Sequence, residues 1–292
     1  MTVPELLPRD ATVRRYPLGM GGMLTRVLEA GEGDSVITFI HGVGARCDRW
    51  AGNIAAMASA GHHAFAFDLP GHGFATKGDG FPYGIRAYAD LVHTFLDTMG
   101  IRRTFLVGTS MGGHIAARVA CDDPERVSGL ILVGTLGVVP MGPAHRAALS
   151  ASVKDTSRQG IEAKLRRLIH NDRLLVDERW ITEEWRINNS PGAGLAFARL
   201  SEYFAGPVDD EVVGTLLSAM GSTVPTVLVW GEEDVMVPIG VLRQCAEVLP
   251  LARTAVIAET SHAPYVERAD AFDGVVLRFM EDRWGPEGSI RV

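Results

Sequence analysis

The sequence predicts an α/β fold built on a mostly parallel sheet whose two faces are both covered by helices. Short apolar runs rich in β-branched residues alternate along the chain with amphipathic helical patterns. Most of these runs are continuous rather than interrupted by polar residues, as expected for strands buried on both faces. Strand and helix patterns that alternate in this way indicate β–α–β units and therefore parallel pairing.

Six apolar runs are the expected strands of this sheet. In chain order they cover residues 35–42, 63–73, 103–108, 127–137, 225–238 and 252–265. Amphipathic helices are expected at 83–100 and 269–284, and another helix is expected directly after the strand that ends at Gly108. Residues 12–29 are expected to add antiparallel strands at one edge.

The region from about Val139 to Ser222 breaks the alternation, because it contains helical patterns and no convincing strand. A helical stretch of this size between two core strands predicts an inserted lid. We therefore expect an α/β core formed by residues 1–138 and 223–292, with a helical lid at 139–222. Glycine and proline residues predict hinge segments at both ends of the lid, namely Gly137, Pro140, Gly142, Pro143 and residues 221–225.

The composition is that of an ordinary globular protein, with 47% hydrophobic and 22% charged residues in a chain of 292. The net charge of −7 and the scattered basic residues argue against nucleic-acid binding. The densest basic group, "KLRR" at 164–167, is expected to form the solvated face of a helix. No run reaches the ~18 apolar residues of a membrane helix, and the N-terminus lacks the apolar segment of a signal peptide. We therefore expect a cytoplasmic protein that does not associate with membranes.

The three cysteines, Cys47, Cys121 and Cys245, are widely spaced and form no C-x-x-C pair. This spacing predicts reduced, structural thiols rather than a disulfide framework or a zinc site. His62, His63, His93, His145 and His170 also show no metal-ligand spacing. No metal or cofactor site is therefore expected. The sequence leaves open whether the chain is a monomer or a homodimer.

Three polar residues fall just after predicted strands: Ser110, Asp234 and His262. Ligands bind at the carboxyl ends of the strands in open parallel sheets, so these residues are expected to meet. Serine is a weak nucleophile that needs a base within hydrogen-bonding reach. His262 would be that base, and Asp234 would fix its tautomer and stabilise the imidazolium. The sequence therefore predicts a catalytic triad.

The neighbouring glycines agree with this chemistry. Gly108 and Gly112 leave room for a tight turn that lifts Ser110 out of the backbone. The backbone N–H of Met111, at the helix start, and that of Val43, in the loop "HGVG" at 41–44, are the expected oxyanion donors.

Each of these residues also has a purely structural interpretation. Ser110 could cap the following helix, Asp234 could form an Asx turn beside Glu232 and Glu233, and His262 could be a loop histidine. Three other histidines, His41, His72 and His114, are expected to shape loops or pack inside a helix.

The motifs resemble the α/β-hydrolase fold superfamily along nearly the whole chain. The matching stretches are "HGVG", "FDLPGHG", "GTSMGG", "ERVSGLILVG", "WGEEDVMVP" and "SHAPYVERADAF". Serine, aspartate and histidine also follow one another in the chain order of that fold's triad. Serine at position 110 distinguishes the chain from haloalkane dehalogenases and epoxide hydrolases, which are similar otherwise.

Within the superfamily, the chain looks most like the meta-cleavage-product hydrolases, which split C–C bonds in dienoates formed from aromatic rings. The likeness includes "SMGGH", "PERVSGLILVG" and, in the lid, "EEWRINN". It implies that Arg186 contacts a keto-acid group. The chain departs from the family at Thr109, usually asparagine, at Ala263, usually tryptophan, and at Gly52, usually asparagine. The 41–50 loop also lacks the family's glycine-proline-glycine pattern.

The expected function is that of a serine hydrolase without a cofactor, acting on a small carbonyl substrate. The substrate is expected to carry a carboxylate and to be cleaved at a C–C or ester bond, with Arg186, Gly42, Thr109 and Trp185 as substrate-binding residues. A general carboxylesterase or lactonase with an apolar pocket is an alternative, and haloperoxidase and acyltransferase chemistry use the same triad. A ligand-binding protein without turnover is a third class. Lid aromatics are expected to supply apolar walls, with Trp180, Trp185, Phe197, Tyr203 and Phe204 as candidates.

Overall fold

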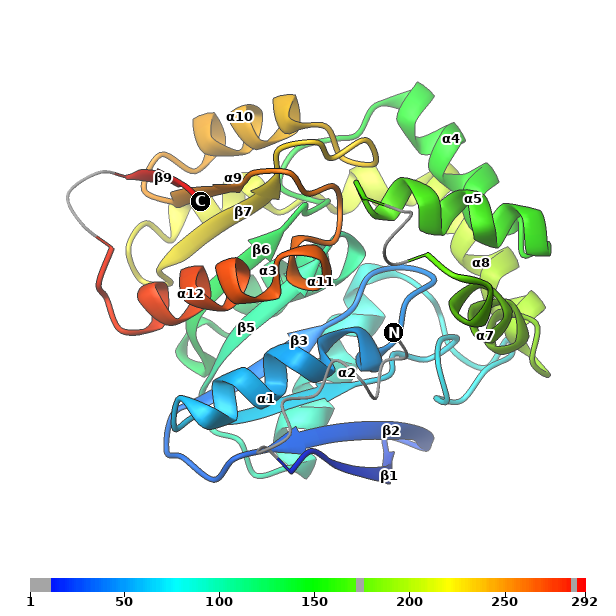
Figure 1. The fold of residues 1–292 in the computed structure, drawn as a ribbon, viewed down its shortest axis with the longest axis horizontal. Coiled ribbons are helices and arrows are strands. Elements are labelled where there is room, and N and C mark those ends of the chain that lie inside the picture. The colour runs from blue at the N-terminus through cyan, green and yellow to red at the C-terminus, as the bar shows by residue number, and fades with distance from the viewer. Residues whose placement is uncertain (1–11, 172–175, 285–287) are drawn as a thin grey trace.

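A mostly parallel, nine-stranded sheet organises the part of the chain that the computed structural model describes, residues 12–171, 176–284 and 288–292 (Figure 1). The strand order is β1-β2-β4-β3-β5-β6-β7-β8-β9. The strands are β1 (Arg14–Met20), β2 (Met23–Ala30), β3 (Val36–Ile40), β4 (His63–Phe67), β5 (Thr104–Thr109), β6 (Val127–Val133), β7 (Thr226–Gly231), β8 (Arg253–Ile257) and β9 (Ser289–Arg291). β1 and β2 form the predicted antiparallel edge, and the pairs from β4 to β9 are parallel.

The register aligns the carboxyl ends of the central strands. Ile40 of β3 lies opposite Gly108 of β5, and Thr109 of β5 lies opposite Val133 of β6. Val133 in turn pairs with Val229 of β7. The polar residues that follow these strands therefore emerge at the same edge of the sheet.

Helices cover both faces of the sheet, as the continuous apolar strands predict. One apolar core lies between the sheet and α1 (Ala51–Ser59) and α12 (Ala269–Met280), which are in front of the sheet in Figure 1. The opposite core contains side chains of α2 (Ile85–Thr98), α3 (Met111–Asp122) and α10 (Ile239–Val248). A short helix, α11 (Pro264–Glu267), precedes α12.

The chain between β6 and β7 forms helices in the described residues, and we call residues 139–222 the insertion. Most of the insertion lies beyond the carboxyl ends of the strands, on the right of Figure 1. Its helices are α4 (Pro143–Lys154), α5 (Arg158–Leu168), α7 (Glu178–Asn188), α8 (Ala193–Ala205) and α9 (Gly214–Ala219). The helical patterns expected in this region, "HRAALSASVKDTS", "GIEAKLRRLIHN", "TEEWRINN" and "AGLAFARLSEYFAG", coincide with α4, α5, α7 and α8.

Four helices and one strand were not predicted: α1, α9, α10, α11 and β9. In α1 an alanine-rich sequence with Gly52 gives little contrast between its faces, and five of its nine residues are buried. Amphipathic periodicity is the main helical signal in a sequence, so such a helix is hard to detect. Within the described ranges, no helix combines the length and the apolar character that a bilayer span requires.

Candidate active site

Ser110 stands at the turn between β5 and α3 in a conformation that non-glycine residues rarely adopt. Its φ is 54° and its ψ is −120°, outside the usual regions for L-residues. Ser110 is the N-cap residue of α3, yet its side chain accepts no capping hydrogen bond. The Ser110 N–H instead donates to Val133 O on β6 at 2.9 Å. Helix capping therefore does not explain this serine.

Two glycines make the turn sterically allowed, as predicted. A Cβ atom on Gly108 would lie 2.2 Å from Gly112 O, and one on Gly112 would lie 2.4 Å from Ile40 O. Real Cβ atoms do not approach backbone oxygens so closely, so larger residues would push α3 away from the sheet. The turn brings Ser110 next to the loop after β3, because a Cβ on Gly42 would be only 3.1 Å from Ser110 Cβ.

Asp234 and His262 form a buried pair at the same edge of the sheet. Asp234 Oδ2 lies 2.7 Å from His262 Nδ1, and the two residues are 5% and 4% exposed. The other carboxylate oxygen of Asp234 accepts hydrogen bonds from the N–H groups of Met236 and Val237, each at 2.8 Å. These bonds fix the carboxylate so that one oxygen faces the imidazole. The Asx turn and the contact with histidine are therefore compatible, because Asp234 makes both at once.

Gly134, the first residue after β6, completes the space for this pair. It has a φ of 47°, and a Cβ here would lie 2.9 Å from His262 Nδ1 and 3.1 Å from Asp234 Oδ2. The sequence analysis did not predict a role for this glycine.

The loop after β3 carries the backbone groups predicted to bind an oxyanion. His41 shapes this loop, because Nδ1 contacts Gly42 O at 2.8 Å and Nε2 accepts the N–H of Leu69 at 2.9 Å. Burial lowers the pKa of His41 and so favours the neutral ring that this pair of bonds needs. The structural role expected for His41 is therefore confirmed.

Met111 carries the other N–H group predicted to bind the oxyanion. It is the first residue of α3, and helix-starting N–H groups lack a partner within the helix.

A cavity of about 60 Å³ lies between this edge of the sheet and the insertion. Its core side is lined by Val43, Gly44, Arg49 and Met236. The insertion supplies mostly apolar side chains, including Leu149, Val153, Ile161, Leu165, Leu168 and Phe197. The polar residues of the lining are Arg49, Ser152, Lys164, Glu184 and Asn188. Phe197 is the one member of the five predicted lid aromatics that lines this cavity.

None of the four residues predicted to bind substrate, Gly42, Thr109, Trp185 and Arg186, is part of the cavity lining. Arg186 and Trp185 are exposed on α7, and Arg186 borders a separate hollow with Phe74 and Glu183. The buried face of α7 consists of Ile181, Glu184, Ile187 and Asn188. The helix thus turns Glu184, rather than Arg186, toward the cavity.

The "KLRR" segment differs in part from its predicted solvated face. Arg166 and Arg167 are exposed, but Lys164 is half-buried and lines the cavity. Its Nζ donates to Ser152 O at 2.9 Å and to Asp155 O at 2.6 Å. Lys164 lies one turn from Ile161 and Leu168, on the apolar side of α5, and its long chain reaches along that side.

A family model described as "alpha/beta hydrolase fold" matches residues 35–269, which is most of the chain. This chain belongs to the alpha/beta hydrolase fold family. It is 29% identical to a 2-hydroxy-6-oxononadienedioate/2-hydroxy-6-oxononatrienedioate hydrolase of Burkholderia vietnamiensis, over 86% of this chain and 89% of the relative. It is 30% identical to a dihydrolipoyllysine-residue acetyltransferase component of an acetoin cleaving system of Cupriavidus necator, over 93% and 70% of the two chains.

A solved structure shares the fold. The 2-hydroxy-6-oxo-6-phenylhexa-2,4-dienoate hydrolase of Rhodococcus sp. strain RHA1 superposes with a TM-score of 0.81 at 20% identity, covering 93% of this chain and 99% of that one. The fold prediction is therefore confirmed, as is the similarity to meta-cleavage-product hydrolases.

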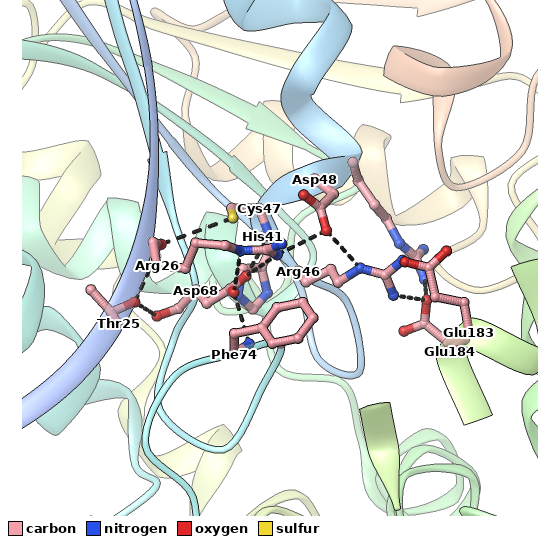
Figure 2. Close-up of polar contacts among 12 residues, drawn as sticks. Thr25, Arg26, His41, Arg46, Cys47, Asp48, Asp68, Phe74, Glu183 and Glu184 are labelled. Atoms are coloured by element: carbon pink, nitrogen blue, oxygen red, sulfur yellow. Dashed lines mark hydrogen bonds and ion pairs between the residues drawn. The ribbon is translucent and has the colours of Figure 1, made fainter. Parts of the chain in front are cut away.

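In this alpha/beta hydrolase, a buried ionic network joins the core to the insertion (Figure 2). Arg26 on β2 contacts Asp68 at 3.0 Å and Asp48 at 2.8 Å. Asp48 also contacts Arg46 at 2.9 Å, and Arg46 reaches Glu184 on α7 at 2.8 Å. Each of these side chains is less than one-fifth exposed. The Arg46–Glu184 contact therefore ties the loop after β3 to the insertion.

Glu184 is ionised within this network. Burial by itself would raise the pKa of Glu184, but the guanidinium groups of Arg46 and Arg49 hold it below its usual value. Arg46 also contacts Glu183 at 2.9 Å, but that glutamate is 47% exposed. The two adjacent glutamates thus bind the same arginine from very different environments.

Thr109 and Tyr265 continue the polar surroundings on the core side. Burial raises the pKa of Tyr265, while Arg49 and Thr109 beside its hydroxyl lower it. The Thr109 hydroxyl is buried without a hydrogen bond of good geometry. Tyr265 therefore bridges the space between Arg49 and the residue that precedes Ser110.

Sequence reasoning missed Arg46, Arg49, Lys164, Glu184 and Gly134. The "GARCDRW" segment was the available signal, because the 41–50 loop that contains it departs from the family's glycine-proline-glycine pattern. Among the described residues, no cluster of three or more histidine, cysteine or acidic side chains could hold a metal ion.

Proposed function

We propose that the chain is a serine hydrolase in which Ser110 is the nucleophile, His262 the general base and Asp234 the residue that orients it. The observation that carries the proposal is the 2.7 Å contact between Asp234 and His262 Nδ1, at the same edge of the sheet as a serine held at positive φ. An aspartate on Nδ1 keeps a proton there and leaves Nε2 free to accept one from a serine hydroxyl.

In the proposed reaction, Ser110 Oγ adds to the substrate carbonyl carbon while its proton passes to His262 Nε2. The N–H groups of Val43 and Met111 donate to the resulting oxyanion, and such donors are worth about 3 kcal/mol each. Collapse of the intermediate breaks the bond to the leaving group, which takes the proton from His262. A water molecule deprotonated by His262 then releases the acyl group and restores Ser110.

The proposed substrate is a small carbonyl compound that carries a carboxylate and is cleaved at a C–C or ester bond. The relative from Burkholderia vietnamiensis, named for a dienedioate substrate, supports this class. The lining of the cavity supports it too, since apolar walls surround two cationic side chains. The cavity of about 60 Å³ is well below the roughly 300–1,000 Å³ of ligand pockets. We therefore propose that the insertion acts as a lid that opens to admit substrate, with Gly137, Gly142 and Gly221 as its hinges.

Steady-state kinetics test this function. The wild type is expected to hydrolyse 4-nitrophenyl acyl esters or a 2-hydroxy-6-oxo-dienoate, and the preferred compound identifies the scissile bond. Ser110→Ala is expected to lose at least about 1,000-fold in kcat. Absence of turnover on both compounds, or an active Ser110→Ala variant, would contradict the proposal.

Acyl transfer is the second candidate, because the relative from Cupriavidus necator is named an acetyltransferase component. The same acyl-Ser110 intermediate would then pass its acyl group to a thiol instead of water. Product analysis of acyl-ester turnover with dihydrolipoamide present separates the two outcomes, since transfer gives a thioester and hydrolysis gives a free acid.

A further inference from the structure

The charged side chains that line the cavity do not balance one another. Two are cationic, Arg49 and Lys164, and one is anionic, Glu184. Glu184 is also shared with Arg46, which lies behind it and contacts it at 2.8 Å. One carboxylate thus serves three nearby cations, although Arg46 has Asp48 and the exposed Glu183 as further partners. Buried charges are normally paired, so the cavity has room for one additional negative charge.

Arg49 has unused hydrogen-bonding capacity. Its side chain is 7% exposed, and it contacts Glu184 at 3.2 Å through Nη2. Its Nε is buried and has no hydrogen-bond partner. The guanidinium also lies over the Trp180 ring, 5.4 Å from the ring centre, which fixes its plane. A buried, unpartnered N–H on a fixed guanidinium is suited to bind a carboxylate oxygen.

Lys164 supplies the second positive charge from the insertion. Its Nζ is held by two backbone carbonyls, and among the described residues no carboxylate lies within ion-pair distance of it. Burial lowers the pKa of Lys164, and the negative charges of Asp155 and Glu184 oppose that effect. A ligand carboxylate nearby would further stabilise the charged form.

We infer that Arg49, together with Lys164, forms the subsite that binds the carboxylate of the substrate, in place of Arg186. This inference rests on the proposed function, because the carboxylate that it places at one end of the cavity belongs to the substrate of the proposed hydrolase. Arg49 is in the loop that also contains Val43, and the Tyr265 hydroxyl lies beside both Arg49 and Thr109. A carboxylate at Arg49 would therefore lie in the cavity that Val43, the proposed oxyanion donor, also lines. Glu184 is the positioning residue, because one of its carboxylate oxygens contacts both Arg46 and Arg49.

Titration calorimetry at pH 7 with C4–C8 alkanoates and their matched primary amides tests the subsite without requiring turnover. The best alkanoate is expected to bind the wild type about 10- to 100-fold more tightly than its amide, as charged hydrogen bonds predict. This preference should fall below about threefold in Arg49→Gln and in Lys164→Met. Arg49→Lys, which retains the charge, should recover part of it.

The Arg186→Gln variant distinguishes carboxylate binding by Arg49 and Lys164 from binding by Arg186, which the sequence resemblance implies. We expect it to retain the wild-type preference for the alkanoate. Loss of the preference in Arg186→Gln but not in Arg49→Gln would overturn the inference, as would equal binding of alkanoates and amides to the wild type. If Arg49→Gln does not fold, Lys164→Met decides alone. Failure of the proposed hydrolase function would appear separately, as no ester or dienoate turnover by a wild type that still prefers alkanoates.

Discussion

Replacing Glu184 by glutamine is expected to destabilise the protein strongly, because it leaves two buried arginines short of a partner. The Glu184 side chain is 3% exposed and contacts Arg46 at 2.8 Å and Arg49 at 3.2 Å. With an effective dielectric constant of about 20, each contact has a gross Coulomb energy on the order of 5 kcal/mol. Most of that energy offsets desolvation, and removing one partner of a buried pair costs about 3–5 kcal/mol. We therefore expect Glu184→Gln to lose about 3–5 kcal/mol of unfolding free energy at pH 7.

The adjacent glutamate provides a matched control. Glu183 contacts the same arginine at 2.9 Å but is 47% exposed, and solvent-exposed pairs contribute about 0–1 kcal/mol. Urea denaturation followed by circular dichroism should place Glu183→Gln within about 1 kcal/mol of wild type. At roughly 2 °C per kcal/mol, Glu184→Gln should melt about 6–10 °C lower than wild type.

The pH dependence of this difference provides a further check. The folded-state pKa of Glu184 is lowered below its ordinary value of 4.5, so its contribution is complete above pH 4.5 and is lost as the pH falls through the lowered value. The gap between wild type and Glu184→Gln should therefore narrow in acid. Equal stability of the Glu183 and Glu184 variants at pH 7 would refute the reasoning that the buried network holds the insertion on the core.

Other substitutions test separate parts of the structure. Burial raises the pKa of Asp273 to about 7, so the native state favours its neutral form, and the stability linked to it declines as the pH rises from about 4 through 7. Asp273→Asn should gain up to about 4 kcal/mol relative to wild type at pH 8 and little at pH 4, as measured by urea denaturation, with exposed Asp90→Asn on α2 as a control that lacks this gain. Gly134→Ala should reduce kcat/KM at least about 100-fold, because its Cβ would lie 2.9 Å from His262 Nδ1. Gly22 has a φ of 77°, but a Cβ there would have nothing within 4 Å, so Gly22→Ala should retain activity. Comparable losses of kcat/KM in the two variants would show that backbone strain alone causes the effect.

Most of the fold was predictable because its signals are local. Continuous apolar strands, the helical insertion and the glycines around Ser110 each follow from short stretches of sequence, and all are present. Strand lengths were less predictable, because the apolar runs continue past the last paired residue. The strand expected at 225–238 ends at Gly231, where the chain turns toward Asp234. Helix α1 was missed because it is buried with little contrast between its faces.

The surroundings of the site were less predictable, because they depend on which side of each helix faces the core. Arg186 and Glu184 are two residues apart on α7, and that spacing turns their side chains about 200° from each other. A resemblance to known motifs cannot decide which of the two faces the cavity when the local helix phase is unknown. Arg49 and Lys164 come together from segments more than 100 residues apart in the sequence, so only the tertiary structure reveals that they share a cavity.

Reaction with a fluorophosphonate, followed by peptide mass mapping, tests directly whether Ser110 is an activated nucleophile. An activated serine is phosphonylated in one step, and the modified residue is identified without knowledge of the substrate. We expect a single adduct on Ser110, no adduct in Ser110→Ala, and labelling slowed at least about 100-fold in His262→Ala. Labelling of wild type and Ser110→Ala at the same rate, or an adduct on another residue, would contradict this role of Ser110.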